Sequence, residues 1–283
     1  MRQIETIAGI RGAIAEARAA GARIGFVPTM GFLHEGHLRL VDAANRRAGC
    51  VVMSVFVNPT QFGPSEDFSR YPRDLRGDSA KAESRGVDLL FVPDVAEIYP
   101  VTPSVHVTAD DLPTRWEGEI RPGHFSGVLT VVAKLFNIVA PDVAVFGRKD
   151  FQQAALIRRM VRELNFPIDI VVAPTIREPD GLALSSRNVY LDDAARANAL
   201  GLVESLRAAE RAFAGGERRG DELSRVGRES LARYPEVRVD YFAVVDPLAM
   251  KPVQEAAADS VAIVAARVGP TRLIDNLVLG EGA

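Results

Sequence analysis

The sequence lacks the cysteines for an internal disulfide and the long apolar runs of membrane-spanning segments. Cys50 is the single cysteine among 283 residues, which excludes an internal disulfide framework and a cluster of thiolate metal ligands. The apolar run at residues 50–57, interrupted only by Ser54, is far shorter than the roughly 20 residues that cross a bilayer, so we expect a buried strand there. The first residues lack the basic start and apolar stretch of a secretory signal, which predicts a cytoplasmic protein.

The sequence also has no excess of positive charge. The 34 lysines and arginines are outnumbered by 37 aspartates and glutamates, so the net charge is −3 and no overall positive field attracts nucleic acid or an anionic membrane. Only four of the basic residues are lysine, and one of them, Lys149, comes shortly after a glycine. Of the four histidines, His34 and His37 lie in one turn. Any phosphate-binding charge must therefore be local.

Up to about residue 175, apolar strand-like runs alternate with helical stretches. The runs are apolar throughout rather than alternating, which indicates a parallel sheet buried on both faces. We therefore predict a Rossmann-like, doubly wound α/β domain over residues 1–175. The predicted strands are residues 24–27, 50–57, 87–92, 143–146 and 168–172, and the predicted helices are residues 36–48 and 150–164.

The pattern changes in the last part of the chain. Two helical segments are followed by three runs that alternate in polarity, an order that is typical of a small α+β domain with an antiparallel sheet. We assign this smaller C-terminal domain to residues 176–283. Its predicted helices are residues 192–214 and 221–233, and its predicted strands are residues 237–245, 261–268 and 273–279.

The first candidate site lies where the first predicted strand ends. Residues 28–37 lead into a helical pattern and place His34 and His37 at the helix N-terminus, while Gly31 and Gly36 let the backbone approach a ligand closely. Backbone N–H groups without partners there, together with the positive end of the helix dipole, form a phosphate site. The dipole also favours neutral imidazole, which can donate a hydrogen bond to an anionic oxygen.

Two alternatives apply to this histidine pair. A zinc-protease helix requires His-Glu-x-x-His, with the histidines four positions apart. Here His37 comes three positions after His34, and no third ligand is near, so we discount zinc. The other alternative is that His34 and Glu35 merely cap the helix, and an isolated histidine pair does not decide between capping and phosphate binding.

A polar turn, Asn58-Pro59-Thr60-Gln61, follows the predicted strand at residues 50–57. The carboxyl ends of parallel strands are where open α/β sheets bind ligands, so Asn58 and Gln61 can reach a small polar substrate. Taken alone, however, the segment is better explained as a simple turn started by Asn-Pro.

Another turn, Gly147-Arg148-Lys149-Asp150, follows the predicted strand at residues 143–146. An ammonium group at this position can neutralise charge that accumulates on phosphate oxygens in a transition state. The alternative is a helix capped by Asp150 with solvated basic residues beside it, and Asp150 can serve both purposes.

A fourth segment, Ser185-Ser186-Arg187, follows a turn at residues 179–181. It presents two hydroxyls and a guanidinium that can fork onto phosphate oxygens. For this tripeptide alone, a helix-capping serine pair beside a surface arginine is the better explanation.

The segment His34-Glu35-Gly36-His37 resembles the His-x-Gly-His signature of class I aminoacyl-tRNA synthetases and related nucleotidyltransferases. The longer string at residues 28–37 resembles the pantothenate synthetase (pantoate–β-alanine ligase) family. The segments at residues 58–63, 147–153 and 175–188 are similar to the same family. The resemblance covers essentially the whole chain, although the C-terminal domain matches mainly in length and pattern.

Residues 121–128 also look like this family, although Ser126 stands where arginine is common. We assign this segment no catalytic role, since His124 can equally be a hydrogen-bonded structural histidine. A second departure is Arg148, which occupies the position of the family's usual glutamate. Lys149 and Asp150 stay in register with the family, but any role for the side chain at position 148 is in doubt.

The resemblance implies an ATP-dependent ligase, forming a C–N bond, that activates (R)-pantoate as an acyl-adenylate and joins it to β-alanine. It implies catalytic roles for His34, His37 and Lys149, with His37 as proton donor, and pantoate or β-alanine contacts for Gln61, Gln153 and Asn58. Ile176 would hold adenine through backbone atoms, within a stretch similar to the synthetases' mobile Lys-Met-Ser-Lys loop. The implied ATP-binding residues are Met30, Gly31, Phe32, Leu33, His34, Glu35, Gly36, His37, Gly147, Arg148, Lys149, Asp150, Ile176, Leu184, Ser185, Ser186 and Arg187.

ATP is thus expected as substrate, with Mg²⁺ on its phosphates and no dedicated protein cage for the metal. The expected partners are ATP, pantoate and β-alanine, without nucleic acid or membrane, and the family implies a homodimer. Two alternatives stay open: a nucleotidyltransferase of the same superfamily that has no amine acceptor, and a non-catalytic ATP-binding sensor.

Overall fold

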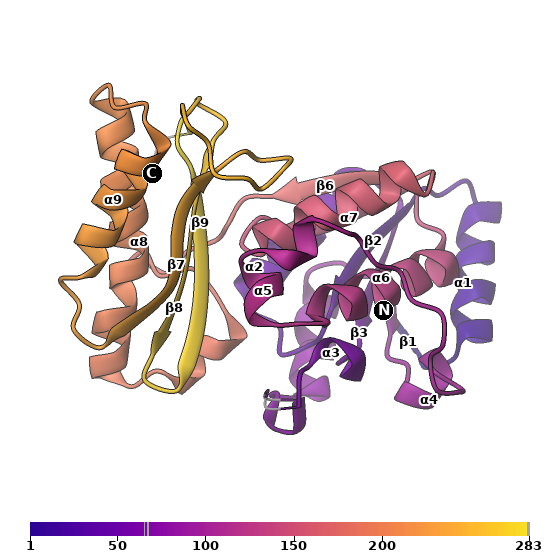
Figure 1. Ribbon diagram of the computed structural model, residues 1–283. Helices are drawn as coiled ribbons and strands as arrows, with labels where there is room; N and C mark the ends of the chain where they lie inside the picture. The colour runs from indigo at the N-terminus through magenta and orange to yellow at the C-terminus, as the bar shows by residue number, and fades with distance from the viewer. Residues whose placement is uncertain (65, 67, 282–283) are drawn as a thin grey trace. The chain divides into compact units, whose positions relative to one another are not determined.

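Figure 1 shows a computed structural model of the chain, which describes residues 1–64, 66 and 68–281. The chain divides into two compact units. Unit 1 comprises residues 1–147 and 156–174, and unit 2 comprises residues 148–155 and the chain from residue 175 onwards. In the part of the chain that the structure describes, no helix has the length and apolarity to cross a membrane.

Unit 1 is built on a six-stranded sheet in which every pair of neighbouring strands is parallel, as predicted. The strands are β1 (Arg2–Ile4), β2 (Ile24–Thr29), β3 (Cys50–Val55), β4 (Leu89–Phe91), β5 (Val143–Gly147) and β6 (Asp169–Ala173), in the order β1-β4-β3-β2-β5-β6. The direction of strand addition reverses between β2 and β5. In open parallel sheets, ligands bind at the carboxyl ends of the strands on either side of such a reversal.

Helices cover both faces of this sheet, which confirms the doubly wound architecture. On one face, Val27 of β2 belongs to a buried cluster with Val41 of α2 (Glu35–Asn45) and Ala82 of α3 (Leu75–Ser84). The neighbouring residue, Phe26, points to the opposite face and meets Phe136 of α6 (His124–Val139) edge to face at 6.4 Å. The other helices are α1 (Ile7–Ala19), α4 (Val95–Ile98), α5 (Glu117–Ile120) and α7 (Phe151–Glu163), whose first residues belong to unit 2.

Several elements of unit 1 escaped the sequence analysis. No prediction was made for β1, α1, α3 or α6. Helix α6 is buried along nearly its whole circumference, so it lacks the polar stripe that reveals an amphipathic helix. Strand β3 ends at Val55 rather than Val57, because Asn58 and Pro59 start the 3₁₀ turn η1 (Pro59–Gln61).

Unit 2 has the predicted α+β form with a three-stranded antiparallel sheet. Its elements are the 3₁₀ turn η4 (Ser186–Tyr190), α8 (Asp193–Ala214), α9 (Gly220–Leu231), β7 (Val237–Val245), β8 (Val261–Val268) and β9 (Thr271–Val278). The two helices share a buried core with the sheet, in which Leu206, Leu223 and Phe242 take part. Gly227 lies against the Phe242 ring so closely that no side chain fits at that position.

Candidate functional site

The turn after β2 has a strained backbone. Gly31 has a φ of 83° and Phe32 a φ of 51°, both in the left-handed region. A Cβ at position 31 would lie 2.8 Å from an Asp78 carboxylate oxygen and 2.9 Å from a Val55 methyl carbon. Glycine is therefore required at position 31 for both conformation and space.

Asp78 of α3 holds this turn in place. Its side chain is buried and accepts hydrogen bonds from the backbone N–H groups of Phe32 (2.7 Å) and Leu33 (2.6 Å). From the same helix, the Lys81 ammonium donates to the Leu33 carbonyl oxygen at 2.8 Å. The sequence analysis missed both residues, because they lie more than 40 positions from the turn along the chain and α3 was not predicted.

His34 is the residue before the first turn of α2, and its ring lies against the ring of His37, with 4.1 Å between the centroids. The His34 backbone N–H donates to Nδ1 of His37 at 3.3 Å. Because Nδ1 accepts this bond, neutral His37 carries its proton on Nε2 and presents a donor there. The Glu35 carboxylate pairs with Arg39 and Arg85, so its side chain is engaged within the protein.

Gln61 ends η1 and is buried. Its Nε2 donates to Sδ of Met30 at 3.1 Å, and its Oε1 accepts from Nδ2 of Asn58 at 3.1 Å. Gln61 and the turn after β2 are thus neighbours beyond the carboxyl ends of β3 and β2.

Asn58 is only 1% exposed, and protein groups engage both ends of its side-chain amide. Its Nδ2 also donates to the Gly127 carbonyl at 3.2 Å, while its Oδ1 accepts from the backbone and hydroxyl of Thr60 and from the Tyr99 hydroxyl. The sequence analysis predicted that Asn58 reaches a substrate. Its contacts show that it holds Gln61, and the substrate contact stays a prediction.

The turn that carries Lys149 is fastened to β9 within unit 2. Nδ2 of Asn276 donates to the carbonyl oxygens of Arg148 (2.9 Å) and Lys149 (2.8 Å). The Arg148 guanidinium binds both carboxylate oxygens of Glu281 at 2.6 Å. The Lys149 ammonium lies 3.7 Å from the Asp150 carboxylate. Arg148 thus has a structural partner, which explains how the chain accommodates arginine here.

Ion pairs shape the segment that contains Ser185, Ser186 and Arg187. Arg177 forks onto Asp275 at 2.6 and 3.1 Å, while Arg196 binds Glu178 and Asp180, each at 2.6 Å. The Leu184 N–H donates to the Ile176 carbonyl at 2.9 Å.

The Ser185 hydroxyl oxygen accepts from the Arg187 N–H at 3.2 Å and caps η4. Ser185 therefore has the capping function that the sequence suggested. Its hydroxyl hydrogen can still donate to a ligand. Gln153, the other predicted acid-binding residue, is half-buried in the first turn of α7.

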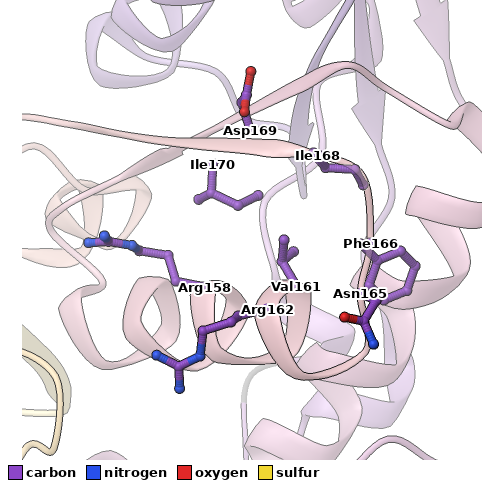
Figure 2. Close-up of a pocket in the computed structure, with 8 residues that line it drawn as sticks. All are labelled: Arg158, Val161, Arg162, Asn165, Phe166, Ile168, Asp169 and Ile170. Atoms are coloured by element: carbon purple, nitrogen blue, oxygen red, sulfur yellow. The ribbon is translucent and has the colours of Figure 1, made fainter.

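A separate depression of about 510 Å³ lies on unit 1 between α7 and β6 (Figure 2). It combines the apolar side chains of Val161, Ile168 and Ile170 with the guanidinium groups of Arg158 and Arg162. None of the predicted site residues lines it, so it is not the site that the motifs define.

Comparisons with known proteins agree with the geometry of both units. The family model described as pantoate-beta-alanine ligase matches residues 2–278. The pantothenate synthetase of Acidobacterium capsulatum is 52% identical to the chain and covers 99% of it and 98% of its own length.

Solved structures are also similar to the whole chain. The crystal structure of pantothenate synthetase from Thermus thermophilus has a TM-score of 0.94 at 49% identity, with 99% of each chain covered. The pantoate-beta-alanine ligase from Francisella tularensis, complexed with beta-gamma ATP and beta-alanine, has a TM-score of 0.82 at 34% identity. It covers 100% of this chain and 99% of its own.

Proposed function

The chain belongs to the pantoate-beta-alanine ligase family, and we propose that it activates (R)-pantoate with ATP and joins the activated acid to β-alanine, giving pantothenate. The complex of the Francisella relative supports ATP and β-alanine as ligands of this chain. ATP chemistry also supports a cytoplasmic enzyme.

The contact between Gln61 and Met30 carries the proposal. The turn after β2 offers a helix N-terminus to phosphate, and the Gln61 amide offers a donor to an organic acid. Their direct contact would place a bound carboxylate beside a bound phosphate. Attack by a carboxylate on the α-phosphorus requires this arrangement, whereas a nucleotidyltransferase or a sensor without an acid substrate does not.

In the first step, a pantoate carboxylate oxygen attacks the α-phosphorus of ATP. The bond from that phosphorus to the bridging oxygen breaks, pyrophosphate leaves with the electron pair, and pantoyl adenylate forms. Nε2–H of His37 donates to a phosphate oxygen, and His34 binds the same phosphate group. The Lys149 ammonium neutralises negative charge that develops on the phosphate oxygens. Gln61 and Gln153 orient the carboxylate in line with the leaving group, a contribution that can be worth several kcal/mol.

In the second step, the neutral amine of β-alanine attacks the carbonyl carbon of pantoyl adenylate. The amide bond forms as the bond from that carbon to the AMP phosphate oxygen breaks; AMP leaves with the electron pair, and the nitrogen loses a proton to water. The phosphate contacts of Ser185, Ser186 and Arg187 stay predictions, supported by the hydroxyls and the guanidinium that this segment carries.

Mg²⁺ would enter with ATP and screen its phosphate charge, held by phosphate oxygens and water. In the described part of the chain, no group of three or more His, Cys, Asp or Glu side chains is placed to hold a metal. We also propose a homodimer, which sedimentation would detect as a particle of about twice the 30.6 kDa chain mass.

Pyrophosphate exchange tests the proposed reaction. The protein is incubated with Mg-ATP and labelled pyrophosphate, with and without pantoate and before any β-alanine, and label in ATP is measured. Exchange that depends on pantoate would establish the acyl-adenylate step, and AMP formation that depends on β-alanine would complete the reaction. A folded protein that binds ATP without exchange would contradict the proposal and support the sensor.

A further inference from the structure

A buried imidazole holds the main chain of Gln61. His124, the first residue of α6, is 9% exposed, and its Nδ1 lies 2.8 Å from the Gln61 carbonyl oxygen. A carbonyl oxygen only accepts, so Nδ1 must carry a hydrogen. The other ring nitrogen, Nε2, lies 2.9 Å from Nη1 of Arg121, a group that only donates. Both contacts are satisfied only by the neutral ring with its hydrogen on Nδ1.

Arg121 is itself fixed. Its Nε and Nη2 bind the two carboxylate oxygens of Glu66 at 2.8 and 2.6 Å, in a pair whose side chains are about four-fifths buried. Burial alone would raise the pKa of Glu66, but hydrogen bonding and charge pairing with Arg121 outweigh it and lower the pKa. Glu66, Arg121, His124 and Gln61 therefore form a continuous chain of hydrogen bonds.

His124 is not protonated near neutral pH, although carboxylates lie near it. Burial is the largest influence, and with the positive charge of Arg121 it lowers the pKa of His124 to about 4. The carboxylates of Glu66 and Glu117 and the bond to the Gln61 carbonyl act in the opposite direction and are outweighed. The ring consequently stays neutral under the conditions in which ATP chemistry runs.

The same turn of α6 also orients the side chain of Gln61. The Thr60 N–H can only donate, so the end of the Asn58 amide that it contacts must be the oxygen, Oδ1. The opposite end, Nδ2, donates to the Gly127 carbonyl oxygen and to Oε1 of Gln61. Oε1 is thereby engaged, and Nε2 is the end that faces Met30. Gly127 permits this contact, because a Cβ there would lie 2.4 Å from the Thr60 carbonyl oxygen.

We propose that His124 is a positioning residue that fixes Gln61 so that its Nε2 is presented as a donor to the acid substrate. The inference rests on the proposed function, in which Gln61 binds pantoate. The first turn of α6 thus controls Gln61 twice, through His124 on the main chain and through Gly127 and Asn58 on the side chain. Neither His124 nor Gly127 needs to touch a substrate.

Kinetics of four variants test this role. His124→Leu removes the donor, whereas His124→Asn keeps an N–H donor at the place of Nδ1. We expect His124→Leu to raise KM for pantoate about tenfold, equivalent to about 1.4 kcal/mol, and to change KM for ATP less than about twofold. His124→Asn should stay within about threefold of wild type for pantoate. Gln61→Ala serves as the reference, and the exposed His106→Asn serves as the control.

The outcomes separate this inference from the proposed function. If Gln61→Ala raises KM for pantoate and folded His124→Leu does not, His124 has no positioning role. Equal losses in His124→Leu and His124→Asn would also overturn it. If Gln61→Ala leaves KM for pantoate unchanged, the proposed role of Gln61 fails instead.

A measurement on the wild-type protein covers the case in which His124→Leu does not fold. Nitrogen-15 NMR of the histidine rings near pH 6 should show His124 neutral with its hydrogen on Nδ1, and pantoate should shift its signals but not those of His106. A hydrogen on Nε2, or signals that do not respond to pantoate, would refute the proposal.

Discussion

At the scale of single residues, the proposed phosphate turn depends on a carboxylate that lies far from it in the sequence. Asp78 accepts two backbone N–H groups in a place closed to water. Such charge-assisted bonds compensate for the strained φ angle of Phe32. The supported turn leads directly into His34, whose backbone N–H binds His37.

Asp78→Asn should destabilise the protein and impair catalysis. An amide can accept at only one of its two ends, so one N–H group of the turn would face another donor. We expect the free energy of unfolding to fall by about 2 kcal/mol, measured by urea denaturation, and kcat to fall with it. Asp74→Asn is the control, because the Asp74 side chain caps α3 by accepting from the Gly77 N–H. Equal kcat values for the two variants would contradict this role for Asp78.

His124 should also make stability depend on pH. Its pKa is lowered from 6.5 to about 4, so between these values the unfolded chain binds a proton that the folded protein does not. The contribution of neutral His124 to the free energy of unfolding is therefore fully present above pH 6.5. This contribution falls by about 3 kcal/mol as the pH falls towards 4. The His124→Asn variant has no titrating group at this position. As the pH falls from 6.5 to 4, its free energy of unfolding in urea should therefore fall by about 3 kcal/mol less than that of the wild type. Parallel stability curves would show that burial does not depress this pKa.

At the scale of elements, β9 and the segment that follows it hold the turn between β5 and α7. Asn276 binds two successive carbonyl oxygens of the turn, and Glu281 binds the Arg148 guanidinium. The turn precedes the helix that carries Gln153, so the partner of Arg148 also affects the start of α7.

Replacing Arg148 with glutamate, the residue usual in the family, should weaken this attachment. Arg148→Glu would face the Glu281 carboxylate and cost about 0.5 kcal/mol, since the pair is partly exposed. The double change Arg148→Glu with Glu281→Arg should restore the loss at low salt, and high salt should reduce both effects. Thermal unfolding of the two variants at two ionic strengths measures this. A double variant no more stable than Arg148→Glu would show that the ion pair contributes nothing.

At the scale of the whole molecule, each unit has its own sheet and its own buried core. The net charge of −3 gives no general attraction for polyanions, so nucleotide binding must depend on local groups. We propose that the helix N-terminus and the basic residues of the motifs supply those groups.

A non-hydrolysable ATP analogue should therefore stabilise the folded protein by mass action. At about a hundred times its Kd it should add about 2.7 kcal/mol, which thermal unfolding would record as a rise of several degrees in Tm. His37→Ala should reduce the rise, whereas His106→Ala should retain it. Equal shifts in the two variants would remove His37 from the nucleotide site.

Much of the architecture was predictable because patterns among residues close together in the sequence determine it. Uniformly apolar runs such as residues 143–146 predicted parallel strands, and alternation near residues 237–245 predicted the antiparallel sheet. The turn chemistry of residues 28–37 predicted a phosphate site and carried the family resemblance. Helix α6 was not predicted, because a helix that is buried on nearly all sides lacks the periodic change between apolar and polar residues that indicates a helix.

The sequence by itself determined the order and type of most strands and helices, the histidine turn at a helix N-terminus, and the family. Only the tertiary structure decided that Asp78 supports that turn, that Asn58 binds Gln61 and Gly127, and that His124 holds Gln61. The reason is physical. Periodicity and turn chemistry act between residues a few positions apart, whereas the contacts of Asp78 and His124 join residues 45 to 63 positions apart, which become neighbours only when the helices pack on the sheet.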